Sequence, residues 1–253
     1  MKTWKKIILG VSLISLFLGG GLVAWGYSQG GLTDLQNQTK SEQDYVKKEV
    51  KDFNKIDIKS SSYNVLIKNG DVDKTTLSYY QKTKNPIDTS VKDGQLTIND
   101  SNSELDSTSN KHINFFGLKD LVRLSTLNEE VRNKTIVITL PKKQTIDFLK
   151  VDLATGNLDL SNSTIKQADI NLNVGDLTFT KMIVSNLKAN LDVGSVDSDH
   201  TLFTNSDLSI AMGDYSGDNL IFNGHNKLDV TSGDIEIALK DYTLNVQADS
   251  HSG

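Results

Sequence analysis

Regularly spaced glycines organise the second half of this chain and constrain its fold more than any other feature. The intervals between them are 19, 19, 19, 20 and 20 residues. A fixed period of about twenty residues is typical of repeat architectures, in which each repeat stacks on its neighbour. The glycines of this ladder are Gly156, Gly175, Gly194, Gly213, Gly233 and Gly253.

Four apolar columns keep step with the glycines. They lie five and three positions before each glycine, and two and nine positions after it. In the first repeat these positions are Val151, Leu153, Leu158 and Ile165, and the equivalent positions of the next four repeats are apolar as well. Polar residues fill the positions four before and one after each glycine. Alternation with a period of two is typical of strands that bury one face.

The period and the alternation together predict an all-β fold. Glycine tolerates the positive φ of a sharp corner, so we expect two strands of each repeat to meet there and a short third segment to follow. Like residues of successive repeats would stack about 4.8 Å apart, as neighbouring strands do. The sequence therefore predicts a parallel β-solenoid, right-handed like a β-helix, with 19–20-residue coils over residues 148–253.

Residues 1–31 predict one N-terminal transmembrane helix that acts as a signal anchor. Three lysines precede the apolar run Ile7–Trp25, which at about 1.5 Å per residue nearly spans a ~30 Å hydrocarbon core. The lysines should stay in the cytoplasm, which places the rest of the chain outside. The alternative is a cleaved signal peptide, but Trp25 is bulky for a cleavage site. We expect a single-pass cell-membrane protein with an extracytoplasmic C-terminal domain.

The remaining segments divide into a linker and one β-strand-repeat domain. Residues 32–52 are polar and predict a linker with a short helix around Glu42–Lys51. Residues 53–253 form the domain, and a hairpin with a tight turn is expected at Asp93-Gly94. Residues 101–133 interrupt the pattern with an amphipathic stretch at 113–127. This insertion predicts a helix that caps the β structure, or alternatively one that contacts the membrane or a partner.

The composition excludes several kinds of chemistry. The chain has no cysteine, which excludes disulfides, thiolate metal sites and cysteine nucleophiles. Its net charge is −5, and without the three lysines of the first six residues 24 basic residues face 32 acidic ones, or −8. That balance argues against a nucleic-acid partner and accommodates a cationic partner more easily.

No catalytic constellation is recognisable. A carbohydrate-active β-helix needs acidic and basic side chains grouped on one face, and the repeat block has no arginine. We expect its lysines to hold no common column. They are Lys150, Lys166, Lys181, Lys188, Lys227 and Lys240. The motifs of serine hydrolases, zinc proteases and nucleotide-binding proteins are absent from the sequence. We therefore predict no enzyme, no catalytic residue and no cofactor-binding residue.

The histidines and aspartates of the chain are possible metal ligands. His200, His225 and His251 lie at unrelated phases of the repeat, and His112 lies alone beside the insertion. Aspartates follow three corner glycines, as calcium ligands do in some β-rolls, but the nonapeptide pattern of those proteins is missing. Turn-forming aspartates on a solvated edge are the favoured interpretation, so no metal site is predicted. These aspartates are Asp176, Asp214 and Asp234.

Several segments resemble the putative-adhesin family of bacterial β-strand-repeat envelope proteins, a domain of unknown function in membrane-anchored proteins of Gram-positive bacteria. The likeness covers about residues 53–253. It is carried by Ile56-Asp57-Ile58, by Ile136–Pro141, and by the corners Thr155-Gly156-Asn157, Val174-Gly175-Asp176 and Ser232-Gly233-Asp234. The resemblance implies a β-solenoid outside the membrane with no known catalytic residues. Some relatives are tied to envelope-stress signalling.

These observations favour a non-catalytic, membrane-anchored β-solenoid that binds, scaffolds or senses stress at the bacterial cell surface. Its expected partners are the membrane, through the N-terminal helix, and an envelope protein or a cell-wall component. The alternative is a carbohydrate-active β-helix enzyme that acts on cell-wall polysaccharide. A groove lined by two or more carboxylates and a basic residue would favour that alternative.

Overall fold

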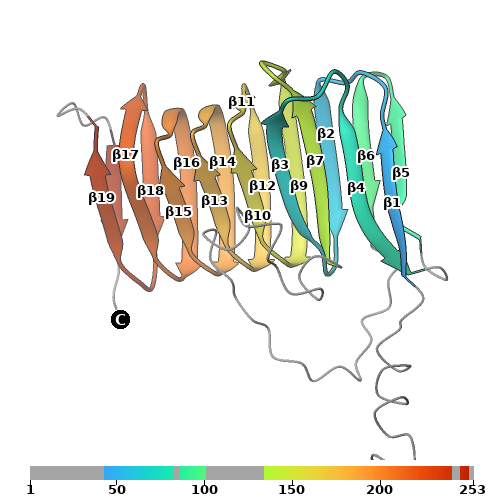
Figure 1. Ribbon diagram of the computed structural model, residues 1–253. Coiled ribbons are helices and arrows are strands. Elements are labelled where there is room, and N and C mark those ends of the chain that lie inside the picture. Colours follow the sequence, from blue (N-terminus) through green and yellow to red (C-terminus); the bar gives the residue numbers. More distant parts are fainter. Residues whose placement is uncertain (1–42, 83–85, 101–133, 241–245, 251–253) are drawn as a thin grey trace, which may run out of the picture. The chain divides into compact units, whose positions relative to one another are not determined.

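The computed structural model describes residues 43–82, 86–100, 134–240 and 246–250, and the fold below is that of the unit Asp44–Gly253 (Figure 1). The predicted anchor at 1–31 and the predicted helix within 101–133 lie outside the described residues. Within the described ranges, no helix is long and apolar enough to cross a membrane.

The described elements are strands, which wind into a solenoid with three faces. The first face, sheet A, has one short strand per coil, and these strands pair in parallel (Figure 1). In the repeat region they are β10 (Leu158–Ser161), β13 (Leu177–Thr180), β15 (Val196–Asp199), β17 (Tyr215–Asn223) and β19 (Ile235–Leu239).

The second face, sheet B, has the longer strands, which also pair in parallel. They are β9 (Phe148–Thr155), β12 (Ala168–Val174), β14 (Ile183–Val193), β16 (Leu202–Met212), β18 (Asn226–Val230) and β20 (Val246–Ser250). A short third face lies between the two sheets. It consists of β8 (Thr145–Ile146), β11 (Thr164–Ile165) and the adjoining ends of β14, β16 and β17.

The register confirms the repeat and the predicted parallel solenoid. On sheet A, Leu158 pairs with Leu177, which pairs with Val196, so one coil advances the chain by one period. The predicted apolar columns point inward and form one continuous core along the axis. Phe203 packs against Phe179 and Phe222 of the adjacent coils, with ring centroids 5.2 and 5.6 Å away. Each coil therefore buries its apolar side chains mainly against its neighbours.

Each coil turns at three corners, of which the sequence marks only the first. The first corner, from sheet B to sheet A, carries the glycine ladder, with φ between 139° and 150° at five glycines. The second corner has positive φ at residues that are not glycine, namely Lys143, Asn162, Lys181, His200 and Asn219. The third corner has positive φ at Asn186, Asn205 and Gly224.

Glycine is required at the first corner for two reasons. The φ of 146° at Gly194 is a conformation that residues with a side chain rarely adopt. In addition, a Cβ atom on Gly194 would lie 1.9 Å from the carbonyl oxygen of Gly175 in the preceding coil. The same close approach recurs between Gly175 and Gly156, at 2.0 Å. The empty Cβ position is therefore where the neighbouring backbone packs.

The coils do not follow the chain in order at the N-terminal end. Strand β2 (Lys55–Ser60) pairs in parallel with β9 on one side and with β6 (Gln95–Asn99) on the other. Strand β3 (Asn64–Gly70) lies in the same way between β10 and β7 (Thr135–Pro141). The coil made of β2 and β3 is therefore inserted between a later coil and the first regular one.

Antiparallel strands close this end of the solenoid. Strand β4 (Thr76–Lys82) pairs antiparallel with β7 and also pairs with β1 (Gln43–Glu49), while β5 (Asp88–Lys92) pairs antiparallel with β6. The β5–β6 hairpin turns at Asp93 and Gly94, with φ of 50° and 72°, which confirms the predicted tight turn. The N-terminal region thus ends the parallel stack with hairpin pairings.

The predicted short helix around Glu42–Lys51 is wrong, because residues Gln43–Glu49 form strand β1. Pairing with the edge of β4 satisfies the backbone of this segment and overrides its weak local preference for a helix. The Tyr45 ring also packs against Tyr80 of β4, with centroids 4.9 Å apart. Part of the predicted linker therefore extends sheet A.

The insertion 101–133 joins β6 of sheet B to β7 of sheet A, so its two flanks meet at the first corner. Asp100, the last residue before the insertion, is buried. Its carboxylate accepts hydrogen bonds from the Ser60 hydroxyl at 3.0 Å and the Ser61 backbone N–H at 2.6 Å. The flanks of the insertion therefore lie at the corner where the regular coils have glycine.

Replacement of a corner glycine should destabilise the whole solenoid. We expect Gly194→Ala to lower the free energy of unfolding by about 2–4 kcal/mol, because Cβ would collide with the Gly175 carbonyl. Gly94→Ala is the matched control: its φ is also positive, but the nearest atom is 3.4 Å away, so a loss of about 1 kcal/mol is expected. Urea unfolding monitored by circular dichroism measures both. Equal losses in the two variants would contradict the stacked corner.

Candidate binding surface

The aspartates that follow the corner glycines form a structural ladder. The backbone N–H of Ser195 donates to Asp176 Oδ1 at 2.9 Å, and the N–H of Asp234 donates to Asp214 Oδ1 at 2.9 Å. Asp176 in turn donates its own N–H to Asn157 Oδ1 at 3.0 Å. Each side chain therefore satisfies a backbone donor of the next coil. Among the described residues, no group of three or more histidine or acidic side chains is arranged to hold a metal ion.

The expectation that the lysines hold no common column is wrong. Lys150, Lys188 and Lys227 occupy one outward row of sheet B, in which they alternate with aspartates in register. The row reads Asp57, Lys150, Asp169, Lys188, Asp207 and Lys227. Opposite charges on adjacent strands stabilise a sheet by roughly 0.2–1 kcal/mol per pair. The row is hard to recognise in the sequence because lysine occupies this position only in every second repeat and aspartate occupies it in the others.

The histidines do not assemble a site. His200 lies at the second corner, with Nδ1 2.6 Å from Asp199 Oδ1. His225 is exposed near the third corner, where its backbone N–H donates to Asn205 Oδ1 at 3.0 Å. His112 and His251 lie outside the described residues. Within the described part of the chain, the two histidines therefore occupy different corners.

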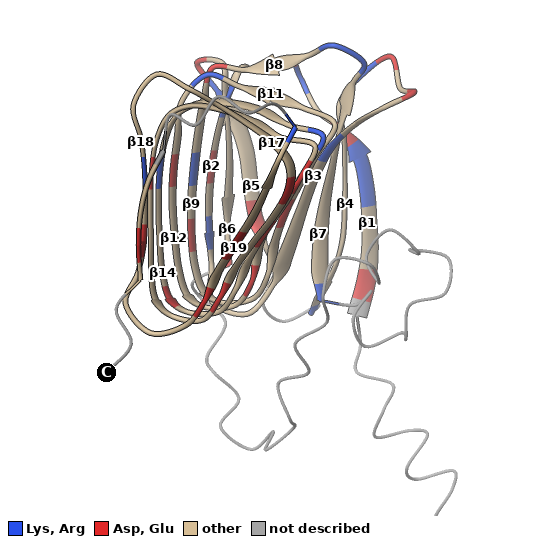
Figure 2. Cartoon of the chain, turned by 90° about the vertical axis from the view of Figure 1, so that its left-hand side faces the viewer, with Lys and Arg blue, Asp and Glu red and all other residues tan. Residues whose placement is uncertain are grey.

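The outer face of sheet A becomes acidic over the C-terminal coils, and we name this surface the acidic face. It consists of the outward side of β15, β17 and β19 together with the first-corner residues just before β13, β17 and β19, and the other outward positions of these strands carry serine or alanine. Figure 2 shows the acidic residues along β17 and β19. Sheet B, in contrast, balances its charges in the alternating row. The carboxylates of the acidic face belong to Asp176, Asp197, Asp199, Asp214, Asp218, Asp234 and Glu236.

One carboxyl group on the same outer side of sheet A is buried. Asp159 lies between Leu66 and Thr178 on the neighbouring strands and is only 2% exposed. Its Oδ2 atom has no hydrogen-bond partner. Burial raises the pKa of Asp159, the Thr178 hydrogen bond lowers it, the charge of Asp176 raises it, and the result is about 8. Asp159 is therefore mostly protonated at neutral pH.

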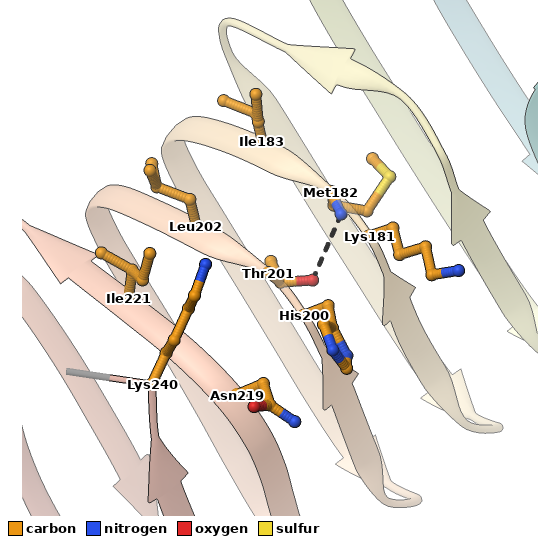
Figure 3. A pocket seen from close by; sticks show the side chains of 9 residues that line it. All are labelled: Lys181, Met182, Ile183, His200, Thr201, Leu202, Asn219, Ile221 and Lys240. Atoms are coloured by element: carbon orange, nitrogen blue, oxygen red, sulfur yellow. Dashed lines mark hydrogen bonds between the residues drawn. The ribbon is translucent and has the colours of Figure 1, made fainter.

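A groove of about 200 Å³ lies at the second corner, beside the acidic face (Figure 3). Ile183, Leu202 and Ile221 lie in a row on successive strands and give the groove an apolar floor. Basic side chains border it, and no carboxylate lines it. The bordering residues are Lys181, His200, Asn219 and Lys240, with Met182 and Thr201 beneath. The groove therefore lacks the paired carboxylates of a glycoside hydrolase.

A family model described as Toastrack DUF4097 matches residues 53–253. The chain belongs to the Toastrack DUF4097 family. This result confirms the resemblance inferred from the corners and the entry strands, and the Toastrack domain is a domain of unknown function. No curated protein matches the chain in sequence.

Two solved structures are similar to the Toastrack domain described here. A putative adhesin from Bacteroides fragilis shares 18% identity over 77% of this chain and 96% of its own, with a TM-score of 0.35. A putative cell adhesion protein from Clostridium sporogenes shares 15% identity over 77% of this chain and 99% of its own, with a TM-score of 0.37. Neither likeness identifies what this chain binds.

Stability should depend on pH through Asp159. Because its pKa is higher in the folded chain than in the unfolded one, the stability it contributes is present at low pH and is lost as pH rises from about 4 to about 8. Over this window the loss is at most about 1.4 kcal/mol per pH unit. We expect Asp159→Asn to remove this loss, so that the variant gains stability over the wild type as pH rises.

Urea unfolding of both proteins at pH 5, 6, 7 and 8 measures this effect. Asp192→Asn, which removes an exposed carboxylate of the first corner, controls for the change in net charge. Parallel pH profiles for the wild type and Asp159→Asn would contradict a raised pKa of the buried Asp159 carboxyl group.

Proposed function

We propose that this Toastrack protein is a non-catalytic binding scaffold, held at the cell membrane by residues 1–31, with its acidic face turned to a basic partner outside the cytoplasm. The observation that carries the proposal is the charge of that face. Four carboxylates lie on β15, β17 and β19, three more lie at the first corner just before β13, β17 and β19, and no lysine or arginine occupies the outward positions between them. Such a field attracts cationic groups and raises their rate of association.

The geometry of the acidic face suits an extended partner. Its carboxylates lie on a continuous parallel sheet with strands about 4.8 Å apart, where Asp199 pairs with Asp218, and Asp197 and Glu236 lie on either side of Ser216. The face is exposed, as at Asp197, Asp214 and Glu236. The corner ladder and the core fix the backbone beneath it, so binding requires little ordering of the scaffold. A basic segment of a membrane or envelope protein has the complementary chemistry, which also fits a role in envelope-stress sensing.

No observation favours the carbohydrate-active alternative. The groove at the second corner is bordered by basic and apolar side chains. A second hollow, between Phe203 and Leu228, has room for about 10 Å³ and lies within the core. That volume is at the lower limit for a single water molecule. Neither of these two spaces positions an acid and a base around a glycosidic bond.

The acidic face should bind cationic peptides in a salt-dependent manner. We expect a fluorescent lysine-rich peptide to bind the full-length chain, and a glutamate-rich peptide of equal length not to bind. Neutralising four outward carboxylates should weaken binding about tenfold or more at low salt, because the attraction is Coulombic. The substitutions are Asp197→Asn, Asp218→Asn, Asp234→Asn and Glu236→Gln.

A matched control variant distinguishes binding at the acidic face from a general effect of net charge. It neutralises four carboxylates of sheet B, so that its net charge changes equally while the acidic face stays intact. Its substitutions are Asp57→Asn, Asp169→Asn, Asp207→Asn and Asp229→Asn. Fluorescence anisotropy at several salt concentrations compares the two variants. An equal loss of affinity in both variants would show a general effect of net charge and would contradict binding at the acidic face.

The anchor is tested separately. We expect the full-length chain to sediment with membranes and its C-terminal domain to be digested by protease added outside intact cells, because residues 1–31 are predicted to span the bilayer. Deletion of residues 1–31 should release the chain into the soluble fraction. Mass spectrometry of the N-terminal peptide distinguishes the anchor from a cleaved signal peptide. A full-length chain that fractionates with cytoplasmic proteins would contradict the predicted topology.

A further inference from the structure

Two short apolar strips lie at opposite edges of sheet A. The first-corner strip is Val174, Val193 and Met212, which pair in register on β12, β14 and β16. The groove strip is Ile183, Leu202 and Ile221 on the short face. Among the described residues, four large hydrophobic side chains are exposed, and three of them belong to these strips. Those three are Ile183 at 48%, Val193 at 39% and Met212 at 58%.

The two strips carry opposite charges. Asp176, Asp192 and Asp214 flank the first-corner strip, and no basic residue occupies that corner in the same coils. Lys181 and Lys240 flank the groove strip together with His200. Neither lysine forms an ion pair with a described residue.

The acidic neighbours of the groove do not cancel this charge pattern. Asp199 is bound to His200, and Asp218 accepts a hydrogen bond from the Asn219 side chain at 2.8 Å. Neither carboxylate is among the groove-lining residues. The ammonium groups of Lys181 and Lys240 therefore remain available to a carboxylate from another molecule.

The strips also share one spacing, because the same coils build both. Val174, Val193 and Met212 advance by one coil at each step, as do Ile183, Leu202 and Ile221. A second copy of the chain therefore presents an apolar, acid-flanked row whose repeat equals that of the apolar, base-flanked row. The opposite charges that flank the two rows then lie at the same repeat.

We propose that the groove strip of one copy packs against the first-corner strip of a second copy, so that the chain associates with itself side by side. The contact is heterologous and leaves a free first-corner strip on one molecule and a free groove strip on the other, so association continues into rows or closes into a ring. Three apolar side chains on each side make a small interface. Association is therefore weak in dilute solution and depends on local concentration. The acidic faces of adjacent copies would combine into one larger surface, which gives a basic partner several attachment points.

Cysteine cross-linking of the full-length chain in detergent tests this contact. Because the chain has no native cysteine, each cross-link can form only between the introduced residues. Leu202→Cys and Met212→Cys are purified separately, mixed and mildly oxidised. We expect the Leu202→Cys chain to cross-link to the Met212→Cys chain more than to itself. Ser216→Cys, on the outer face of sheet A, replaces Met212→Cys as the control and should give no such preference. Equal yields with both partners, or predominant cross-linking of like to like, would overturn the proposal.

Charge reversal in the same assay separates self-association from other occupants of the groove. Lys181→Glu with Lys240→Glu on the Leu202→Cys chain should reduce the mixed cross-link about fivefold or more. On the Met212→Cys chain, Asp192→Lys with Ala211→Lys, the exposed position one period after Asp192, places positive charge beside the first-corner strip and should reduce the cross-link similarly. Pairing the two altered chains should restore it. A loss without restoration would overturn the proposal and would indicate an anionic small molecule as the occupant. Binding of the lysine-rich peptide tests the acidic face independently of either result.

Discussion

The close approach of successive glycines at the first corner is the contact on which the structure depends. The carbonyl oxygen of one glycine occupies the place where a Cβ atom of the next would lie, 2.0 Å from that position at Gly213 and Gly233. The Gly175 N–H meanwhile donates to the Val193 carbonyl at 3.0 Å, so the same corner also carries an intercoil hydrogen bond. The stack closes to strand spacing only because these positions lack side chains.

This constraint divides the residues of each coil into inward and outward positions, which differ in the residue types that they accept. Inward positions must fill a core of constant cross-section, and Phe179, Phe203 and Phe222 show how they do so. Outward positions are free to vary once the backbone bonds are satisfied. Sheet B uses them for alternating charges, whereas sheet A collects carboxylates over its C-terminal coils. The proposed binding role lies in these outward positions, and the corners hold the backbone beneath them in place.

The sequence predicted the regular coils because the same kind of residue recurs at the same position in successive repeats. Gly156 and its successors marked the first corner, and the apolar columns marked the interior. The second and third corners were missed, because residues as different as Lys181, His200 and Asn219 adopt the same positive φ there. The inserted β2–β3 coil was missed because Tyr63 replaces the corner glycine and because its neighbours are distant in the chain. Of the binding surface, only the overall acidity was foreseen. The separation of charge between the sheets depends on which side of each strand faces out.

Hydrogen–deuterium exchange of the full-length chain, with and without a saturating lysine-rich peptide, tests the central claim most directly. The account predicts slower exchange in the strands that bear the acidic face, β15, β17 and β19, and unchanged exchange in β9, β12 and β18 of sheet B. Protection centred on sheet B, or no protection at a peptide concentration that saturates binding, would contradict a scaffold that binds through the outer face of sheet A.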